Sequence, residues 1–359
     1  MRSDRIQTVG DIVGGRYEVK GYLNQGGMQE VYTAYDKLLL RDVALKVPKN
    51  ESAIKRFKRS AVVSARINHS NVAKTLDYLE TGDHSYLIEE LIDGIDLSRV
   101  IKERLLYLDP HLAAWTFHRL AKGVAASHHA GVMHRDLKPS NVMVEGVEAM
   151  TGIKITDFGI AKMAEEELAE AIAGGDESLT ASQTAIGALP YMAPEMIDDI
   201  KSVTTSVDIW SLGAMIYELL VGKKPFGSGL RAVNAIQNRD PLPINHLPGR
   251  KPQFKNNFDE LIEIVRLCLN KDPLKRPTAD DLVVKCESLC YPRITREFGV
   301  VSKFENGFWG FITPTVGRSV FFHIDSVYSE TVLRTGDKVS FARHSGGGSD
   351  RAFPIMKVH

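Results

Sequence analysis

Three side chains near the middle of the chain, Asp136, Asn141 and Asp157, carry carboxylate or amide oxygen atoms, and those of Asn141 and Asp157 suit a magnesium ion. Asp136 and Asn141 belong to the string HRDLKPSN, and Asp157 opens the triplet DFG further along. Carboxylate and amide oxygens are hard ligands, and magnesium in proteins is commonly bound by one or two carboxylates together with substrate phosphates. Upstream, Lys46 has an apolar neighbour on each side in the string VALKV, which is unusual for an ordinary surface lysine. Together these residues indicate chemistry on a metal-bound phosphate.

A third string, APE at Ala193–Glu195, follows HRDLKPSN and DFG in that order. The three strings resemble the catalytic loop, the metal-binding turn and the end of the activation segment of protein kinases. The triplet DFG means little alone, whereas a full catalytic loop with its partners in order is a specific signal. The resemblance covers residues 17–291 and is to the bacterial type of eukaryotic-like (Hanks-type) serine/threonine kinases. It implies transfer of a phosphoryl group from ATP to a serine or threonine of a protein substrate.

The resemblance implies a role for each polar residue, because phosphoryl transfer needs positioning and charge neutralisation more than covalent chemistry. Asp136 would accept or orient the proton of the attacking hydroxyl, and Lys138, typical of the serine/threonine class, would steady the γ-phosphate. Asn141 and Asp157 would bind Mg²⁺, with Mn²⁺ as an alternative, and Lys46 would hold the α- and β-phosphates. The residues expected around the nucleotide are Leu23, Gly26, Gly27, Val31, Ala44, Lys46, Glu89, Glu90 and Ile92.

Three further residues are expected to support the site rather than to touch the substrate. Asp208, at the start of an apolar helix, resembles the residue that anchors the backbone of the catalytic loop. Glu195 and Arg276 resemble the ion pair that holds the activation segment on the lower lobe. A buried pair of this kind fixes geometry and need not add net stability.

The segment that should cover the phosphates departs from the kinase pattern. In LNQGGMQEVY, which spans residues 23–32, Asn24 and Gln29 occupy the positions of the first and third glycines, and only the central Gly26 keeps its place. Asparagine tolerates positive φ better than most residues, and Gly26-Gly27 still allows backbone N–H groups to approach a phosphate. A plain hairpin turn would have the same sequence, so this signal is weak.

The partner of the lysine departs as well. Ser60 stands in place of the helical glutamate of the kinase pattern, and a half-buried lysine without a carboxylate partner is costly to orient. Glu89, in the strand that leads to the hinge, occupies the gatekeeper position at the back of the adenine pocket. We therefore expect Glu89 to pair with Lys46 from the opposite side. The alternative is a Glu89 that points to solvent or is neutral.

Ala188 stands where a threonine normally bonds the catalytic aspartate and lysine, and the loss of one such hydroxyl costs about 1 kcal/mol. Because the metal ligands, the base and both lysines are intact, we expect a working but atypical kinase. The alternative is a catalytically weak or dead pseudokinase scaffold that binds nucleotide and RNA or single-stranded DNA.

Thr180, Ser182 and Thr184 lie on the expected activation segment, and Arg135 precedes the predicted base. A phosphate on one of these hydroxyls would form a charge-assisted contact with Arg135. A transient homodimer would allow such phosphorylation in trans. The alternative is that the three residues are ordinary polar loop residues.

Two aromatic strings near the C-terminus, GFWGFITP and VFFHI, resemble the RNA-binding strand motifs of cold-shock domains, which are five-stranded barrels of the OB type. Alternate side chains of a strand face opposite ways. Trp309 and Phe311 should therefore share one face, and Phe308, Gly310 and Ile312 the other.

A small barrel has one interior, so one aromatic set must lie outside, where a cluster of rings is unusual unless something stacks on it. Bases stack on such rings with ~1–3 kcal/mol each. Single-stranded RNA or DNA should bind weakly and in a salt-sensitive manner, because basic residues barely outnumber acidic ones from residue 297 onward. The alternative is a face that docks onto the kinase or onto a protein partner. The residues expected to contact nucleic acid are Lys303, Trp309, Phe311, Phe321 and His323.

The sequence pattern of the helices and strands that must position these residues predicts an α+β chain. It would form a two-lobed kinase fold followed by a small five-stranded OB-type barrel. Short β-branched and aromatic runs favour strands over residues 17–47, and apolar periodicity favours helices over 52–66, 112–130 and 207–220. After residue 292 the pattern is strand and turn throughout. The expected divisions are an N-terminal tail (1–16), a kinase domain (17–291, with lobes 17–91 and 92–291) and a cold-shock-like domain (298–359).

Bulk properties exclude several classes of protein. A composition of 43% hydrophobic and 25% charged residues allows a folded core, and a formal net charge of +0 provides no global attraction to nucleic acid or a membrane. Cys268, Cys286 and Cys290 lack metal-binding spacing, which favours free thiols in a reducing cytosol. No apolar run follows the N-terminal charges, and the longest apolar stretch, 209–221, is too short to span a bilayer. We expect a cytoplasmic protein without a membrane partner.

Overall fold

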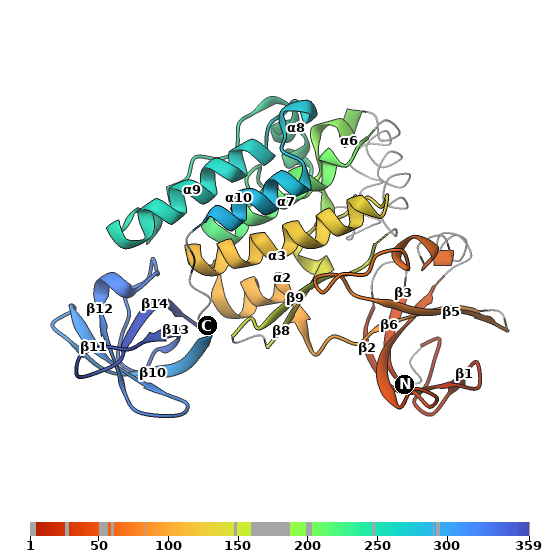
Figure 1. Ribbon diagram of the computed structural model, residues 1–359, viewed down its shortest axis with the longest axis horizontal. Coiled ribbons are helices and arrows are strands. Elements are labelled where there is room, and N and C mark those ends of the chain that lie inside the picture. Colours follow the sequence, from red (N-terminus) through yellow and green to blue (C-terminus); the bar gives the residue numbers. More distant parts are fainter. Residues whose placement is uncertain are drawn as a thin grey trace.

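The computed structural model confirms the predicted α+β class: the chain forms a sheet lobe (β1–β6), a helical lobe (β7–β9 and α2–α10) and a closed barrel (β10–β14). In Figure 1 the barrel and the sheet lobe lie at opposite ends of the helical lobe. The structure describes residues 5–25, 29–49, 57–58, 61–82, 84–146, 149–158, 187–198, 203–245, 248–289, 291 and 295–358.

The sheet lobe has the strand order β1-β2-β3-β4-β6-β5. Its strands are β1 (Ile12–Val13), β2 (Tyr17–Gln25), β3 (Gln29–Asp36), β4 (Arg41–Pro48), β5 (Thr75–Thr81) and β6 (His84–Glu90). In β3 every second residue is buried, as expected for a strand with one face on the core. The central strand β4 is buried continuously from Val43 to Pro48, so its only lysine, Lys46, lies inside the lobe. Of the predicted helix over 52–66, residues 57–58 and 61–64 are described and are helical.

The helical lobe is built around two long helices, α3 and α7. Helix α3 begins after Asp109, whose carboxylate accepts hydrogen bonds from the N–H groups of His111 (3.1 Å) and Leu112 (3.3 Å), as in a standard N-cap. Helix α7 is buried nearly all round and ends at Gly222, which has a left-handed φ of 73°. The larger elements of this lobe are β7 (Gly94–Asp96), α2 (Leu97–Val100), the π-helical η1 (Ile101–Leu105), α3 (Pro110–His129), β8 (Val142–Glu145), β9 (Gly152–Ile155), α6 (Pro194–Asp198), α7 (Ser206–Val221), α8 (Leu230–Asn238), α9 (Pro252–Cys268) and α10 (Ala279–Ser288). The short 3₁₀ turns are η2 (Pro139–Asn141), η4 (Leu189–Tyr191), η5 (Pro248–Arg250) and η6 (Pro273–Lys275).

The barrel closes in the order β10-β11-β12-β14-β13. Its elements are β10 (Arg296–Glu305), β11 (Trp309–Pro314), β12 (Val320–His323), the 3₁₀ turn η7 (Ile324–Ser326), β13 (Lys338–His344) and β14 (Arg351–Lys357). Gly310 and Ile312 face the interior as predicted, but Phe308 does not join them. Phe308 lies in the turn before β11 and is 60% exposed, because the strand pairing starts only at Trp309.

The barrel packs directly onto the helical lobe. Tyr328 and Met356 belong to the main hydrophobic core of that lobe, and the rings of Phe254 on α9 and Phe353 on β14 stack with centroids 5.3 Å apart. A buried ion pair joins the two parts, with Arg296 Nη2 2.7 Å from Asp109 Oδ2, and the two side chains are 5% and 0% exposed. The same Asp109 caps α3, so the barrel and α3 share one buried polar group.

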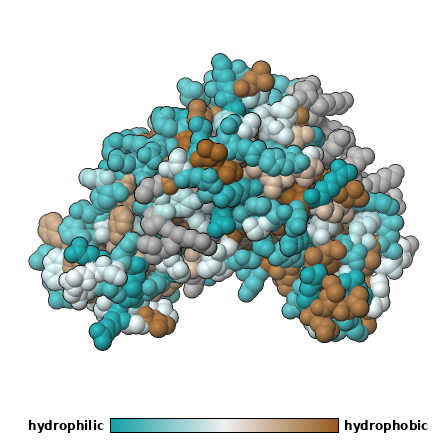
Figure 2. All heavy atoms as spheres, viewed as in Figure 1, coloured by the Kyte–Doolittle hydropathy of each residue, from teal (hydrophilic) through white to brown (hydrophobic). Residues whose placement is uncertain are grey.

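Figure 2 shows the face of Figure 1 as an arch, hollowed between the barrel and the sheet lobe. No helix in the described part of the chain is long and apolar enough to cross a membrane. Cys268 and Cys286 are buried free thiols, as predicted, and Cys290 lies outside the described residues.

Candidate functional site

Lys46 lies between two carboxylates. Its Nζ is 2.6 Å from Glu89 Oε2 and donates to Asp157 Oδ1 at 2.7 Å. The strands β4 and β6 pair with Ala44 opposite Glu89, which places the Glu89 side chain beside Lys46 within one sheet. The side chains of Lys46 and Glu89 are each 7% exposed. The ion pair predicted from the sequence is therefore present, and the alternative of a solvent-exposed Glu89 is wrong.

The charges of this group depend on one another. Burial raises the pKa of Glu89 above its ordinary value, although the ammonium of Lys46 favours the ionised form. Burial would lower the pKa of Lys46, but Asp157 and Glu89 together raise it. Burial would raise the pKa of Asp157, but Lys46 and an amide from Gln29 lower it. One ammonium thus serves two carboxylates, which leaves negative charge for a further cation to balance.

The catalytic loop predicted from HRDLKPSN forms a second polar group. Lys138 Nζ donates to both carboxylate oxygens of Asp136, at 2.9 and 2.7 Å. Asn141 Nδ2 donates to the backbone oxygen of Asp136 at 2.8 Å and to its Oδ2 at 3.0 Å. Asp136 is therefore held in one orientation by two neighbours from its own loop.

The hairpin of β8 and β9 brings the two predicted metal ligands to the same end. Asn141 precedes β8 and Asp157 follows β9, and Thr156 N donates to the backbone oxygen of Asn141 at 2.9 Å. Because the amide nitrogen of Asn141 is turned toward Asp136, its oxygen faces away and can accept a cation. Among the described residues no group of three His, Cys, Asp or Glu side chains could hold a metal. Mg²⁺ does not require one, since it takes most of its ligands from water and phosphates. The donor set therefore fits Mg²⁺ bound together with a nucleotide.

Asp208 holds the catalytic loop from below. Its carboxylate accepts from the backbone N–H of His134 at 2.9 Å and of Arg135 at 2.7 Å, and its Oδ2 is 2.8 Å from Nε2 of His128. Burial would raise the pKa of Asp208, but the hydrogen bond and charge of His128 lower it. These contacts stabilise an unusual backbone, since Arg135 has a φ of 65°. The sequence interpretation foresaw Asp208 but not His128.

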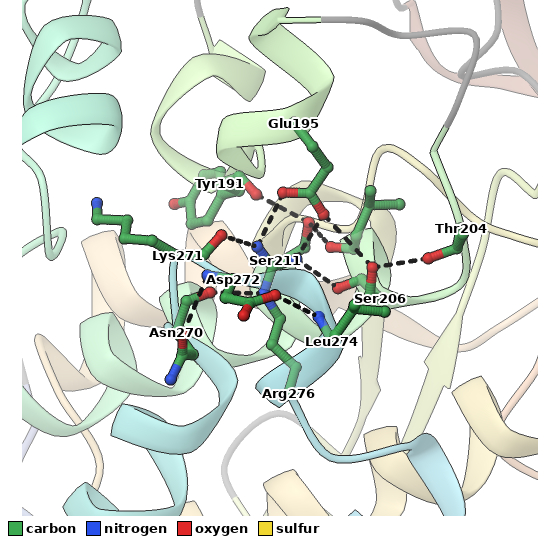
Figure 3. Close-up of polar contacts among 11 residues, drawn as sticks. Tyr191, Glu195, Thr204, Ser206, Ser211, Asn270, Lys271, Asp272, Leu274 and Arg276 are labelled. Carbon is green, nitrogen blue, oxygen red and sulfur yellow. Dashed lines mark hydrogen bonds and ion pairs between the residues drawn. The ribbon is translucent and has the colours of Figure 1, made fainter.

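Glu195 and Arg276 form the predicted ion pair, which is bidentate, with N–O distances of 2.6 and 2.8 Å. Figure 3 shows the guanidinium also directed at main-chain oxygens, and it donates to the backbone oxygens of Ser206 (3.0 Å) and Asn270 (2.8 Å). The Arg276 side chain is 0% exposed. The pair thus joins α6, which follows the activation segment, to the segment before α10.

Gln29 makes a contact that the sequence interpretation missed. From the start of β3 its Nε2 donates to Asp157 Oδ1 at 3.2 Å, and its Oε1 is enclosed with no hydrogen-bond partner among the described residues. A side chain at the position of the third glycine therefore reaches the predicted metal ligand. Its only signal in the sequence was the departure from glycine.

Of the other residues expected around the nucleotide, Leu23, Val31, Ala44 and Glu90 lie on strands of the sheet lobe, and Ile92 lies between β6 and β7. Ala44 is buried, and Val31 on β3 pairs with Lys46 on β4. Ile92 is 9% exposed and Leu23 is 49% exposed. Glu90 pairs with Lys154 of β9 and so connects β6 to the helical lobe. The following predicted residues lie outside the described part of the chain: Gly26, Gly27, Ser60, Thr180, Ser182 and Thr184.

The aromatic face predicted for the barrel is assembled from β11 and β12. The ring centroids of Trp309 and Phe321 are 6.2 Å apart, and those of Phe311 and Phe321 are 5.8 Å apart. His323 pairs with Trp309 across the strands, and Lys303 Nζ lies 5.7 Å from the Trp309 ring centroid. The barrel residues that pack into or against the core of the helical lobe are Tyr328, Phe353, Met356 and Val358, which do not belong to this face.

The family model described as "Protein kinase domain" matches residues 17–285, and the chain therefore belongs to the protein kinase family. The model described as "'Cold-shock' DNA-binding domain" matches residues 297–358. The kinase match includes both polar groups described above, and the cold-shock match includes the barrel apart from Arg296, the first residue of β10.

Similar curated proteins are named serine/threonine-protein kinases. PknA of Mycobacterium tuberculosis is 35% identical over 280 residues, which cover 75% of this chain and 59% of the relative. PkaA of Streptomyces coelicolor is 34% identical over 67% of this chain and 41% of the relative, and PrkC of Bacillus subtilis is 30% identical over 76% and 40%. This chain thus spans less than two thirds of the length of each of these relatives.

Among solved structures, that of Rad53 1-466 in complex with AMP-PNP superposes with a TM-score of 0.55. It shares 22% sequence identity and covers 75% of this chain and 64% of that one. At this identity the similarity shows the fold alone, and the fold is the two-lobed one predicted from the sequence.

Proposed function

We propose that this chain is an ATP- and Mg²⁺-dependent serine/threonine protein kinase whose activity is tuned by single-stranded nucleic acid on its barrel. The observation that carries the proposal is the buried group in which Lys46 Nζ lies 2.7 Å from Asp157 Oδ1, together with an Asp136 carboxylate held by Lys138 and Asn141. The names of the relatives support the choice of serine and threonine as acceptors.

The side chains divide the chemistry among them. Asp136, held by Lys138 and Asn141, would accept the proton of a serine or threonine hydroxyl as it attacks. Lys138 would then neutralise charge on the transferred group, and Lys46 would bind the phosphate oxygens that stay behind. Mg²⁺-bound ATP, when present, supplies the phosphoryl group and an activated leaving group. Asn141 and Asp157 would hold the metal.

The test is phosphoryl transfer by the purified chain with labelled ATP and Mg²⁺. Asp136→Asn should lower turnover by ~10²–10⁴-fold while the nucleotide still raises the melting temperature. Asp259→Asn is the matched control, since that carboxylate is 55% exposed on α9 and its one ion pair among the described residues is with Lys255. If the unaltered chain labels neither itself nor a generic substrate, the kinase proposal is wrong.

The second candidate is a nucleotide-binding adaptor without turnover. Ala188 favours it, because this residue is buried at the position where the kinase pattern has a hydroxyl. In that case Mg²⁺ and nucleotide would still stabilise the chain, but Asp136→Asn would change no catalytic rate. The same assay should be repeated with Mn²⁺ in place of Mg²⁺, since Mn²⁺ is the alternative metal.

The nucleic-acid part is supported by a cluster of three rings on the outer face of the barrel. Trp309, which is 36% exposed, stacks on Phe321, and Phe311 meets both rings edge to face. Trp309→Ala should weaken the binding of a short single strand by about tenfold, since one stacked base contributes ~1–3 kcal/mol. Phosphorylation in trans at Thr180, Ser182 or Thr184 rests on the sequence alone. Mass spectrometry of the chain after incubation with ATP would test it.

A further inference from the structure

The outer aromatic face does not end on the barrel. On β10, Glu305 lies opposite Trp309 on the outer face. Beyond it the outward side chains are, in order, Lys303, Val300 and Phe298, because a bulge between Val301 and Lys303 shifts the alternation by one residue. Val300 is 41% exposed and pairs with Lys338 of β13. The line of outward side chains therefore runs from Trp309 along the strand toward the helical lobe, over ~17 Å for five residues.

At the end of that line lies a cavity of 480 Å³ between the barrel and the helical lobe. It is lined by Phe298 of β10, by Ile95 of β7, by Arg99, Glu103 and Arg104 of α2 and η1, and by Gly146 and Ala149, which lie between β8 and β9. The cavity thus joins the barrel to the elements that directly follow the hinge.

The charge of the cavity is positive. Arg99 pairs with Glu103 at 3.0 Å, whereas Arg104 forms no ion pair with any carboxylate that the structure describes. Lys102 and Arg104 both act on Glu103, since their charges lower the pKa of that carboxyl together with the hydrogen bond from Arg99. This segment carries three cations, Arg99, Lys102 and Arg104, against two carboxylates, Glu103 and the N-cap residue Asp96, so its net charge is positive and an anion would be attracted to it.

Several basic residues of the barrel are already paired with carboxylates, which makes them less available to the phosphates of a nucleic acid. Lys303, the basic residue of the aromatic face, is 2.8 Å from Glu305, and Arg343 and Lys357 are engaged by carboxylates as well. Single-strand binding combines stacked bases with cations along the backbone. The barrel provides the first of these in its rings, but three of its basic residues are already paired.

We propose that a single-stranded nucleic acid bound on the rings of the barrel continues over Val300 and Phe298 into this cavity, where Arg99 and Arg104 of the helical lobe bind its phosphates. The proposal rests on nucleic-acid binding by the barrel and adds a phosphate site on the kinase lobe. A nucleic acid long enough to reach the cavity would contact β7 and α2. Strand β7 pairs with β8, and β8 begins directly after Asn141, the last residue of the catalytic loop.

The experiment is fluorescence anisotropy with the full chain and labelled oligouridylates of increasing length. Oligomers that cover only the rings should bind the unaltered chain and the Arg99→Gln/Arg104→Gln variant equally. Longer oligomers should bind the unaltered chain more tightly than short ones do. The variant should bind these longer oligomers about fivefold more weakly than the unaltered chain. The slope of log affinity against log salt should fall by ~0.7 for each phosphate that the variant no longer neutralises. Arg231→Gln, an exposed arginine on α8 far from the cavity, is the matched control and should behave as the unaltered chain.

Three outcomes separate the two proposals. If long oligomers bind the double variant as tightly as the unaltered chain, the phosphate site is refuted and the barrel proposal stands. If the double variant binds short and long oligomers equally more weakly than the unaltered chain, the arginines act indirectly on the barrel, and the phosphate site is again refuted. If no oligomer binds at any length and Trp309→Ala changes nothing, nucleic-acid binding itself is wrong. Because both arginines are exposed, the melting temperature should not change in any variant.

Discussion

Replacing Glu89 by methionine removes one of the two carboxylates that hold Lys46. The distances to Lys46 Nζ are 2.6 Å from Glu89 and 2.7 Å from Asp157, and the Glu89 side chain is 7% exposed. Breaking a buried pair costs about 3–5 kcal/mol when the remaining charge has no other partner. Here Asp157 remains, so the cost should be closer to that of one charged hydrogen bond, about 1.5–3 kcal/mol.

This cost should appear in nucleotide binding. Without Glu89 the ammonium of Lys46 is left with Asp157, the predicted metal ligand, and must leave it to reach a phosphate. The dissociation constant for Mg²⁺ and a non-hydrolysable ATP analogue should therefore rise about tenfold to hundredfold. Isothermal titration calorimetry measures this constant directly. Glu80→Gln is the control, since this 54% exposed carboxylate on β5 pairs with Lys58 and lies outside the residues expected around the nucleotide.

A double-mutant cycle sharpens the test. If Glu89 acts through Lys46, Glu89→Met should add little to the loss already caused by Lys46→Met. Nucleotide affinity of Glu89→Met within twofold of the unaltered chain, with an unchanged melting temperature, would refute this role of the pair. So would strictly additive losses in the double variant.

Three further changes test other contacts. Gln29→Gly removes an amide that competes with a metal, so it should tighten Mg²⁺–nucleotide binding about fivefold in the same titration, and weaker binding would contradict this reading. Ala188→Thr restores the missing hydroxyl and should raise kcat by up to about tenfold at saturating ATP, whereas an unchanged rate would show that the hydroxyl is not needed. Arg296→Met leaves the buried Asp109 without its partner and should lower the free energy of unfolding by about 3–5 kcal/mol in denaturant titrations. The exposed Arg318→Met is its control, and equal effects of both changes would contradict the ion-pair argument.

The sequence was sufficient where a signal lies within a short string. The loop around Asp136 could be predicted because Lys138 and Asn141 are its own neighbours, and their bonds to it form within that loop. The pair of Lys46 with Glu89 could be predicted as well, because one carboxylate was missing from its usual place and another stood in an unusual one. Both inferences used positions relative to a known pattern.

Contacts between distant segments could not be predicted in this way. Gln29 and Asp157 are 128 positions apart, and Arg296 and Asp109 are 187 apart. Neither contact has a periodicity or a spacing that would reveal it, since each depends on how two finished elements pack. Phe308 was assigned to the wrong face for a local reason. The turn at Asn306 and Gly307, both with positive φ, delays the start of β11 until Trp309.

The pairing of Lys46 with Glu89 also limits which part of the site a regulator could change. Glu89 lies on β6, and β6 pairs with β4 from Val43 to Lys46, so the lysine and its partner belong to one sheet. Movement between elements would leave their distance unchanged. The barrel lies at the opposite end of the helical lobe from these strands (Figure 1) and is joined to the N-terminus of α3 through Asp109.

A chain of contacts leads from Asp109 along α3 to the catalytic loop. Near the other end of α3, His128 contacts Asp208, which holds the backbone of the loop that carries Asp136. We therefore expect a single-stranded oligonucleotide on the barrel to change kcat and to leave the dissociation constant of the nucleotide within twofold. Turnover and calorimetry with and without a saturating oligouridylate measure the two quantities separately. Asp208→Asn should lower kcat and abolish the response to the oligonucleotide. A large change in nucleotide affinity at constant kcat would place the coupling at Lys46 and contradict this route.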